Sequence, residues 1–242
     1  MRLGEAKTPD GMRLYGIGDV HGHDRMLAEM HRRIATDLAE RPVADHRIIH
    51  VGDYADRGPD SAGVIRRLAE LAAEDSRVVC LRGNHDQMLI DFLDNPDAGA
   101  PMLLANGGKE TFRSYDVKTR GQNYAGLAAQ LMTKMPAGER AFLAGLPLTA
   151  RFGDYFFVHA GIRPGVALDR QEARDLIWIR EEFLMSQADH GVVVIHGHTP
   201  ANPVEVMPNR INLDTGAAYG GPLTCVVLEG TEYGLLEVAA GA

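Results

Sequence analysis

Residues 47–58, RIIHVGDYADRG, place a short apolar run directly before a glycine and the acidic side chains Asp53 and Asp56. Such a run followed at once by a turn residue predicts a buried strand, here over Arg47–Val51. Four other segments repeat the arrangement: 13–22 (RLYGIGDVHG), 77–86 (RVVCLRGNHD), 155–161 (YFFVHAG) and 192–199 (VVVIHGHT). Five predicted strands therefore end in glycine-containing turns that carry Asp, Asn or His.

In the first half of the chain these strands alternate with amphipathic segments. Apolar residues recur at helical spacing over Leu27–Leu38 and over Val64–Leu71, and Asp60 offers a start signal for the second helix. Further strands are predicted at Ile211–Leu213, Cys225–Leu228 and Leu235–Val238. Alternating strands and helices favour an α/β fold.

Between Asp91 and Phe152 the alternation gives way to a helical region interrupted by glycines, including Asn106-Gly107-Gly108. We interpret residues 91–152 as a cap inserted into a single domain that spans residues 1–242, a length that suits one α/β domain. Two interpretations of the cap stay open at this point. Its helices either add core packing or present a surface to the substrate.

Composition excludes several classes of protein. With 45% hydrophobic and 24% charged residues the chain should be globular, and a formal net charge of -8 argues against nucleic-acid binding, which relies on surplus Lys and Arg. Cys80 and Cys225 lie in apolar runs, so no disulfide framework is expected. The first eleven residues are polar and no run reaches membrane-spanning length. We therefore expect a cytoplasmic protein with no membrane partner.

The side chains at the strand ends predict one shared metal site, because ligands in open α/β sheets bind at the carboxyl ends of strands. Carboxylate, imidazole and amide groups without thiolate suit Mn²⁺, Fe²⁺ or Zn²⁺ better than Mg²⁺ alone. Each residue taken singly has a structural alternative. Asp19 or Asp53 would cap a helix, Asn84 would form a turn, and His159 or His198 would be a buried, hydrogen-bonded histidine. Five such turns in one chain favour the metal site.

The five motifs in this order resemble those of the metallophosphoesterase (calcineurin-like) superfamily and, within it, the phosphoprotein phosphatase family. Additional segments resemble the bacterial and phage-lambda type of serine/threonine protein phosphatase: Arg82–Met88 with Asn106–Gly108, Ile177–Arg180, and Asp214–Ala217. The resemblance covers most of the chain. It implies a four-layer α-β-β-α sandwich with a helical insertion.

The resemblance also implies two divalent metal ions, with Mn²⁺ expected and Fe or Zn as alternatives. Asp19 and His21 would bind one ion, Asn84, His159 and His198 would bind the other, and Asp53 would bridge both. Two ions roughly 3.5–4 Å apart lower the pKa of a shared water and clamp the attacking and leaving oxygens. The implied reaction is direct attack by metal-bound hydroxide, with no covalent enzyme intermediate.

Four further residues gain roles from the resemblance. Arg57 and Arg180 would bind the phosphoryl group, because a planar guanidinium matches phosphate oxygens. His85 would protonate the leaving oxygen, and Asp56 would orient its ring. The alternative for Asp56 is a simple ion pair with Arg57.

The expected enzyme is a serine/threonine protein phosphatase acting on a phosphorylated protein or a small phosphoester. Because the bacterial branch also includes diadenosine tetraphosphate hydrolases, a dinucleoside polyphosphate is the first alternative substrate. The second alternative is a catalytically silent phosphate-binding module, which need not retain every ligand and both arginines. One departure is Asp86, where the eukaryotic phosphatases usually have Glu.

Overall fold

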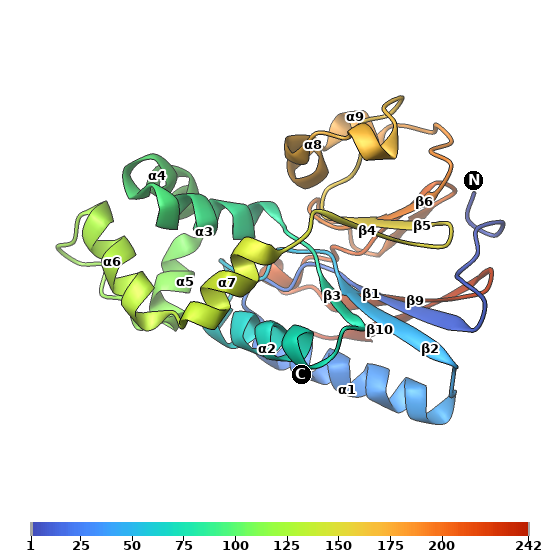
Figure 1. Cartoon of the computed structure of the whole chain (residues 1–242), viewed down its shortest axis with the longest axis horizontal. Coiled ribbons are helices and arrows are strands. Elements are labelled where there is room, and N and C mark those ends of the chain that lie inside the picture. The colour runs from blue at the N-terminus through green and yellow to red at the C-terminus, as the bar shows by residue number, and fades with distance from the viewer. Residues whose placement is uncertain (1, 242) are drawn as a thin grey trace.

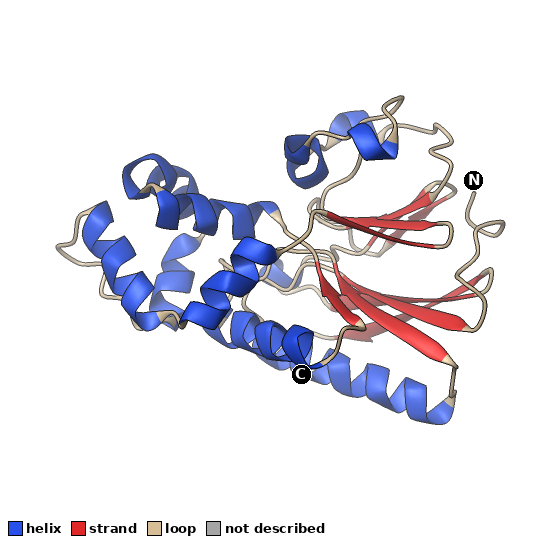
Figure 2. Ribbon diagram, in the orientation of Figure 1, coloured by secondary structure: helices blue, strands red, loops and turns tan. Residues whose placement is uncertain are grey.

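The computed structural model describes residues 2–241 and contains two five-stranded sheets. The sheets pack face to face, helices cover the outer face of each, and a group of further helices extends from one end (Figures 1 and 2). The predicted four-layer α-β-β-α sandwich with a helical insertion is confirmed. No helix within the described residues is long and apolar enough to cross a membrane.

The first sheet holds the N-terminal strands in parallel. Its order is β10-β9-β1-β2-β3, with β1 (Met12–Ile17), β2 (Asp45–His50), β3 (Val78–Cys80), β9 (Leu223–Glu229) and β10 (Glu232–Val238). Ile17 lies opposite His50, and His50 lies opposite Cys80, so the carboxyl ends of β1, β2 and β3 are aligned. The crossover helices α1 (Asp24–Glu40) and α2 (Ser61–Glu74) cover its outer face. Asp60 caps α2 by accepting the Gly63 N–H at 2.8 Å.

The second sheet is built in the same way from the C-terminal half. Its order is β4-β5-β6-β8-β7, with β4 (Thr149–Phe152), β5 (Tyr155–Val158), β6 (Val193–His196), β7 (Glu205–Met207) and β8 (Arg210–Asn212). The central strands β5, β6 and β8 are parallel. The short helices α8 (Ala173–Trp178) and α9 (Glu181–Leu184) cover the outer face, where Leu176 and Phe183 are buried. Two 3₁₀ turns lie at Leu168–Arg170 and Ala217–Tyr219.

A shared apolar core joins the sheets. It contains Leu14, Ile49, Val51, Leu81, Tyr155, Phe157, Ile195, Ile211 and Val226, among others. Gly16 permits close approach, because a Cβ there would lie 3.0 Å from Phe157 and 3.3 Å from Ile195. A parallel strand that is buried on both faces has a nearly continuous apolar sequence. For this reason these strands could be predicted from the sequence.

The inserted helices follow β3. They are α3 (Asn84–Asp94), α4 (Pro96–Ala105), α5 (Gly108–Ser114), α6 (Tyr124–Lys134) and α7 (Ala137–Gly145). Phe92, Leu103, Phe112 and Leu131 are buried in the same apolar cluster as the inner faces of α1 and α2. The cap therefore adds core packing. Its predicted end was too late, since Thr149–Phe152 forms strand β4 and the helices end at Gly145.

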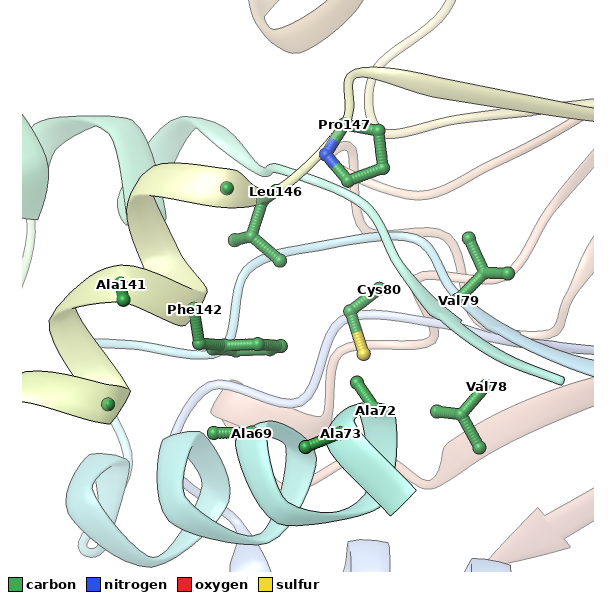
Figure 3. A pocket seen from close by; sticks show the side chains of 12 residues that line it. Ala69, Ala72, Ala73, Val78, Val79, Cys80, Ala141, Phe142, Leu146 and Pro147 are labelled. Carbon is green, nitrogen blue, oxygen red and sulfur yellow. The ribbon is translucent and has the colours of Figure 1, made fainter. Parts of the chain in front are cut away.

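An apolar cleft of about 460 Å³ lies between α2, β3 and α7 (Figure 3). Small or apolar side chains line it, including Ala72, Val79 and Phe142, and it contains none of the predicted site residues. Cys80 also lines this cleft, and burial raises the pKa of its thiol. A thiol held in its neutral form is a poor nucleophile, so the cleft offers no cysteine chemistry.

Candidate metal centre

The parallel strands bring the predicted residues together at their carboxyl ends. Asp19 and His21 follow β1, Asp53 follows β2, Asn84 follows β3, His159 follows β5, and His198 follows β6. All six side chains are buried. Both sheets therefore contribute to one site, as the strand-end placement rule predicts.

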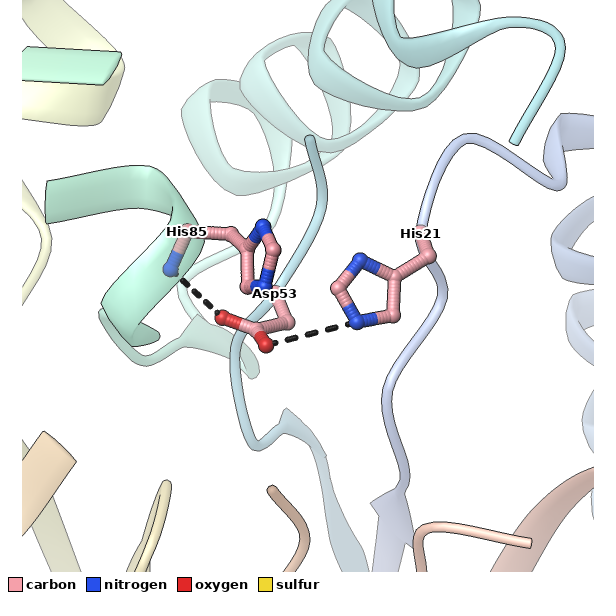
Figure 4. Close-up of side chains that lie close together, drawn as sticks. All are labelled: His21, Asp53 and His85. Atoms are coloured by element: carbon pink, nitrogen blue, oxygen red, sulfur yellow. Dashed lines mark hydrogen bonds and ion pairs between the residues drawn. The ribbon is translucent and has the colours of Figure 1, made fainter. Parts of the chain in front are cut away.

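Asp53 lies at the centre of this group. Its Oδ2 atom is 3.4 Å from His21 Nε2, and its Oδ1 atom is 3.4 Å from His159 Nε2. Oδ1 also accepts the backbone N–H of His85 at 2.9 Å (Figure 4). Possible ligand atoms of His21, Asp53 and His85 lie within 4.8 Å of one another, as do those of Asp53, His159 and His198.

Asn84 joins the second of these groups. Its Oδ1 atom is 2.9 Å from His159 Nε2 and 2.8 Å from His198 Nδ1. Asp19 is turned toward the same side, where its carboxylate accepts the backbone N–H of His198 at 3.1 and 3.3 Å. The structure thus places Asp19 against the His198 turn, whereas His21 points directly at Asp53.

Hydrogen bonds from the far side of the rings orient two of the histidines. His21 Nδ1 is 2.9 Å from the Ala55 carbonyl oxygen, and His159 Nδ1 is 3.1 Å from that of Val51. When Nδ1–H of a neutral ring donates to a carbonyl, Nε2 is left unprotonated, with a lone pair that can bind a metal. In both rings this nitrogen is the one that faces Asp53.

The buried carboxyl groups place several negative charges in a small volume. Burial, with the nearby charges of Asp214 and Asp53, raises the pKa of Asp19 well above its ordinary value. Burial also raises the pKa of Asp53, and it raises that of Asp214 to about 6. Burial therefore disfavours the anionic forms of these carboxyl groups unless a positive charge lies nearby.

The pKa values of the imidazoles are shifted in the opposite direction. Burial lowers the pKa of His21 and His198 well below the ordinary value and lowers that of His159 to about 3. Neutral imidazole is the form that binds metals. His198 Nε2 is also buried and has no hydrogen-bond partner within the described residues.

This combination fits a divalent metal centre. The donor atoms are carboxylate and amide oxygens and imidazole nitrogens, the carboxylates need a countercharge, and one buried ring nitrogen lacks a partner. The residues that would hold the ions are Asp19, His21, Asp53, Asn84, His159 and His198. The site is therefore suited to binding divalent cations.

The predicted acid pair lies beside these ligands. His85 Nδ1 is 2.8 Å from Asp56 Oδ2, and the two side chains are 1% and 0% exposed. Burial lowers the pKa of His85 to about 4 and raises that of Asp56 to about 8. Among the described residues the ion-pair partner of Asp56 is His85, and no Asp56–Arg57 pair forms. The simple ion-pair alternative for Asp56 is therefore wrong.

The two predicted phosphate-binding arginines occupy different environments. Arg57 donates to His21 Nε2 at 3.0 Å, and its guanidinium carbon lies 5.4 Å from the ring centre of Tyr219. Arg180 is exposed, contacts Thr199 Oγ1 at 3.3 Å, and lines a cleft of about 660 Å³. Arg57 thus contacts a candidate ligand directly, whereas the cleft lined by Arg180 contains none of the six candidate ligands.

Trp178 lies in the same cleft as Arg180 and is only half-buried. Its ring meets that of His198 edge-on, with 6.0 Å between the centroids. The apolar run around it predicts a core residue that positions Arg180. In the structure it packs against the main apolar cluster, and it also contacts a candidate ligand and remains accessible from the cleft.

Several site residues have an unusual backbone conformation. His21, Asp53, Asp56, Arg57 and His198 all have positive φ values, between 43° and 71°. Residues other than glycine rarely adopt this region. Such conformations cluster at functional sites, where the surrounding structure holds them in place.

Sequence reasoning assigned no role to two carboxylates that shape the site. Asp86 accepts the backbone N–H groups of Asp53, Tyr54 and Gly83 at 2.9 to 3.0 Å, so it ties together the turns after β2 and β3. Asp214 is buried near Asp19. It directly follows the predicted strand Ile211–Leu213, which is the placement that marked the other ligands. That signal was present in the sequence.

Comparisons with known proteins agree with this geometry. The family model for calcineurin-like phosphoesterases matches residues 12–227. Serine/threonine-protein phosphatase 1 of Salmonella typhimurium is 31% identical over 216 residues, which cover 86% of this chain and 88% of that protein. The asymmetrical bis(5′-nucleosyl)-tetraphosphatase PrpE of Oceanobacillus iheyensis is 26% identical over 233 residues, covering 88% and 87%.

Solved structures agree at the level of the fold. A protein serine/threonine phosphatase from Saccharomyces cerevisiae aligns with a TM-score of 0.60 at 14% identity, covering 96% of this chain and 81% of that one. At this identity the match concerns the architecture alone.

Proposed function

The chain belongs to the calcineurin-like phosphoesterase family, and from this premise we propose that it is a metal-dependent phosphomonoesterase acting on phosphoserine and phosphothreonine in proteins. The observation that carries the proposal is the buried His85–Asp56 pair, with 2.8 Å between Nδ1 and Oδ2. A seryl or threonyl alkoxide is strongly basic, so its departure needs a positioned acid. A family relative that is 31% identical carries the name serine/threonine-protein phosphatase 1, which supports the same substrate class.

The acid pair has a simple division of labour in this proposal. His85 carries a proton at its outward ring nitrogen and delivers it to the leaving oxygen, while Asp56 holds Nδ1 and so orients the ring. Bound divalent cations supply Lewis acidity, which activates water and withdraws charge from the phosphoryl oxygens. No side-chain nucleophile takes part.

The two arginines bind the phosphoryl group. Arg57 lies next to His21 Nε2, and the charges of both Arg57 and Arg180 act on Asp53, so a phosphate bound beside Asp53 would lie near both guanidinium groups. Their N–H groups stabilise the charge that develops on its oxygens in the transition state. Mn²⁺ is the ion we propose, with iron or zinc as alternatives, because imidazole ligands favour these over Mg²⁺.

A second candidate activity is hydrolysis of dinucleoside polyphosphates, favoured by the relatives named bis(5′-nucleosyl)-tetraphosphatase. A nucleotide is a much better leaving group than an alkoxide and needs a general acid less. The deciding experiment compares kcat/KM for a phosphoserine or phosphothreonine peptide with that for diadenosine tetraphosphate. The proposal requires the peptide to be preferred, and a preference of tenfold or more for diadenosine tetraphosphate would replace it.

The proposed compartment is the cytoplasm. Both cysteines are free and buried, which suits a reducing environment. The proposed partners are phosphorylated proteins or small phosphoesters, and the net charge of -8 gives no support to nucleic acid as a partner.

A further inference from the structure

The segment that carries Asp56 and Arg57 is held in an unfavourable backbone conformation. The two residues are consecutive and have φ values of 70° and 66°. A chain segment keeps two left-handed residues in a row only if other groups fix it. Since Asp56 orients His85 and Arg57 is a phosphate ligand in the proposed function, the groups that fix this segment bear on catalysis.

Part of this support comes from the cap. The backbone N–H of Asp56 donates to Ser61 Oγ at 3.0 Å and to Thr111 Oγ1 at 2.9 Å. The Thr111 hydroxyl in turn donates to Asp56 Oδ1 at 2.7 Å, and it lies 3.1 Å from Ser61 Oγ. Thr111 belongs to α5 and is fully buried. A single hydroxyl thus contacts both the backbone and the carboxylate of Asp56.

The turn before α5 supports the neighbouring residue. The Gly107 carbonyl oxygen accepts the backbone N–H of Arg57 at 3.2 Å. Gly107 has a φ of 99°, and a Cβ there would lie 2.9 Å from Arg57 Cγ and 3.0 Å from its backbone nitrogen. The chain can therefore approach Arg57 this closely only because position 107 is glycine.

The two oxygens of Asp56 have separate partners. Oδ1 receives the Thr111 hydroxyl, and Oδ2 lies 2.8 Å from His85 Nδ1. Without the Thr111 hydroxyl, the buried Oδ1 atom of Asp56 would lose a hydrogen-bond donor, and the Asp56 carboxylate would be free to rotate. Because Oδ2 of the same carboxylate contacts His85 Nδ1, this rotation would also change the orientation of the His85 ring.

We propose that Thr111 is a positioning residue of the active site, through which the cap holds Asp56, and hence the His85 ring, in the orientation needed for proton transfer. This inference rests on the proposed phosphomonoesterase function. It gives the cap a catalytic role in addition to its core packing. It also predicts that a residue 55 positions away from Asp56 in the chain controls the acid without touching the substrate.

The test compares Thr111→Val, which keeps the shape but removes the hydroxyl, with Thr111→Ser, which retains it. On a phosphoserine peptide Thr111→Val should lower kcat by about 10²-fold with little change in KM, since small misplacements of catalytic groups have effects of this order. Hydrolysis of p-nitrophenyl phosphate should fall much less, because its leaving group needs little acid. Thr111→Ser should stay within about threefold of the wild type. Thr133→Val, at an exposed position of α6 in the same cap, is the matched control and should have no effect.

A double-mutant cycle separates positioning from general destabilisation. If Thr111 acts through Asp56, Thr111→Val should cost less than about threefold in an Asp56→Asn background. Equal losses in both backgrounds, equal losses on the two substrates, or failure of Ser to restore activity would each overturn the proposal. Should Thr111→Val fail to fold, Thr111→Ser and Thr111→Ala in the two backgrounds give the same comparison.

A readout without turnover keeps this inference distinct from the proposed function. The ring-nitrogen NMR chemical shifts of His85, recorded in metal-free protein, should change in Thr111→Val but not in Thr111→Ser or Thr133→Val. Unchanged shifts would overturn the positioning role even if activity falls. Absence of phosphopeptide hydrolysis by the wild type would instead overturn the proposed function, while the NMR comparison would still test Thr111.

Discussion

Substitution of His85 distinguishes between two roles for this residue, a general acid and a support of the metal centre. If it protonates the leaving oxygen, its importance depends on how poorly that oxygen leaves. His85→Asn should lower the rate on a phosphoserine peptide by about 10²- to 10⁴-fold and the rate on p-nitrophenyl phosphate by much less. Asp56→Asn should show a weaker form of the same pattern. Both rates are to be measured on metal-replete protein, and equal losses on the two substrates would mean that His85 supports the metal centre instead.

The two arginines should behave alike in catalysis despite their different surroundings. Arg57→Ala and Arg180→Ala should each lower kcat/KM by about 10² to 10³, as expected when one transition-state donor is lost. Arg151→Ala, on the exposed side of β4, serves as the control. Metal content, measured by elemental analysis, should remain at the wild-type level. An arginine whose removal empties the metal site while leaving phosphate affinity intact would have a structural role. Arg57 contacts His21 and is the arginine placed to act in this way.

Candidate ligands could be predicted where they directly follow a buried strand. An apolar run precedes each of Asp19, Asp53, Asn84, His159 and His198, and the two sheets bring these positions together. Thr111 had no comparable signal. Its contact with Asp56 spans 55 residues and arises from how α5 packs against α2, which no local pattern encodes.

At the scale of elements, the sequence predicted every strand except β4 and β7, including the edge strands β3 and β10 of the first sheet. β5 and β6 are buried throughout, so their runs are apolar. The unpredicted strands β4 and β7 are short edge strands with polar residues such as Arg151 and Glu205, and each pairs with one neighbour. No residue of β4 or β7 is fully buried, so their sequences carry a weaker pattern.

The contact between α1 and β2 should make stability depend on pH. His31 Nε2 lies 2.9 Å from His50 Nε2, and burial lowers the pKa of His31 to about 4 and that of His50 well below its ordinary value. The folded state therefore keeps both rings neutral, whereas the unfolded chain takes up protons below about pH 6.5. The stability contributed by the neutral rings is present above that pH and is lost as the pH falls toward about 4.

Replacing one of these rings tests the prediction. In His31→Gln the unfolding free energy, measured with urea, should fall less steeply between pH 6.5 and 4, by on the order of 1–3 kcal/mol over that range. The comparison is the difference between variant and wild type at each pH, which cancels the contributions of the site histidines. Parallel curves for the two proteins would show that His31 does not titrate differently on folding.

At the scale of the whole molecule, the candidate ligands come from both sheets, so bound metal should stabilise the complete fold. Chelation should abolish hydrolysis, and Mn²⁺ should restore it better than Mg²⁺. Saturating Mn²⁺ should also raise the midpoint of thermal unfolding, since a ligand at 100 times its Kd adds about 2.7 kcal/mol to the unfolding free energy.

The matched variants are Asp53→Asn, which should lose most of the Mn²⁺-induced rise, and Asp97→Asn, at an exposed position of α4, which should keep it. Differential scanning calorimetry with and without a chelator provides the measurement. Hydrolysis by fully chelated enzyme, together with unchanged unfolding in Mn²⁺, would rule out a metal centre at these residues.

The left-handed backbone at His21, Asp53, Asp56, Arg57 and His198 has a consequence for laboratory evolution. Each of these residues adds strain on the order of 1–3 kcal/mol, which glycine would relieve at the same position. A library selected only for resistance to heat would therefore favour glycine at Arg57, the least buried of the five, because at the other four a cavity and lost hydrogen bonds would offset the relieved strain. The survivors would be more stable than the parent and less active, since Arg57 is a proposed phosphate ligand. Screens for thermostable variants of this protein should accordingly hold these five positions fixed and let exposed positions elsewhere vary.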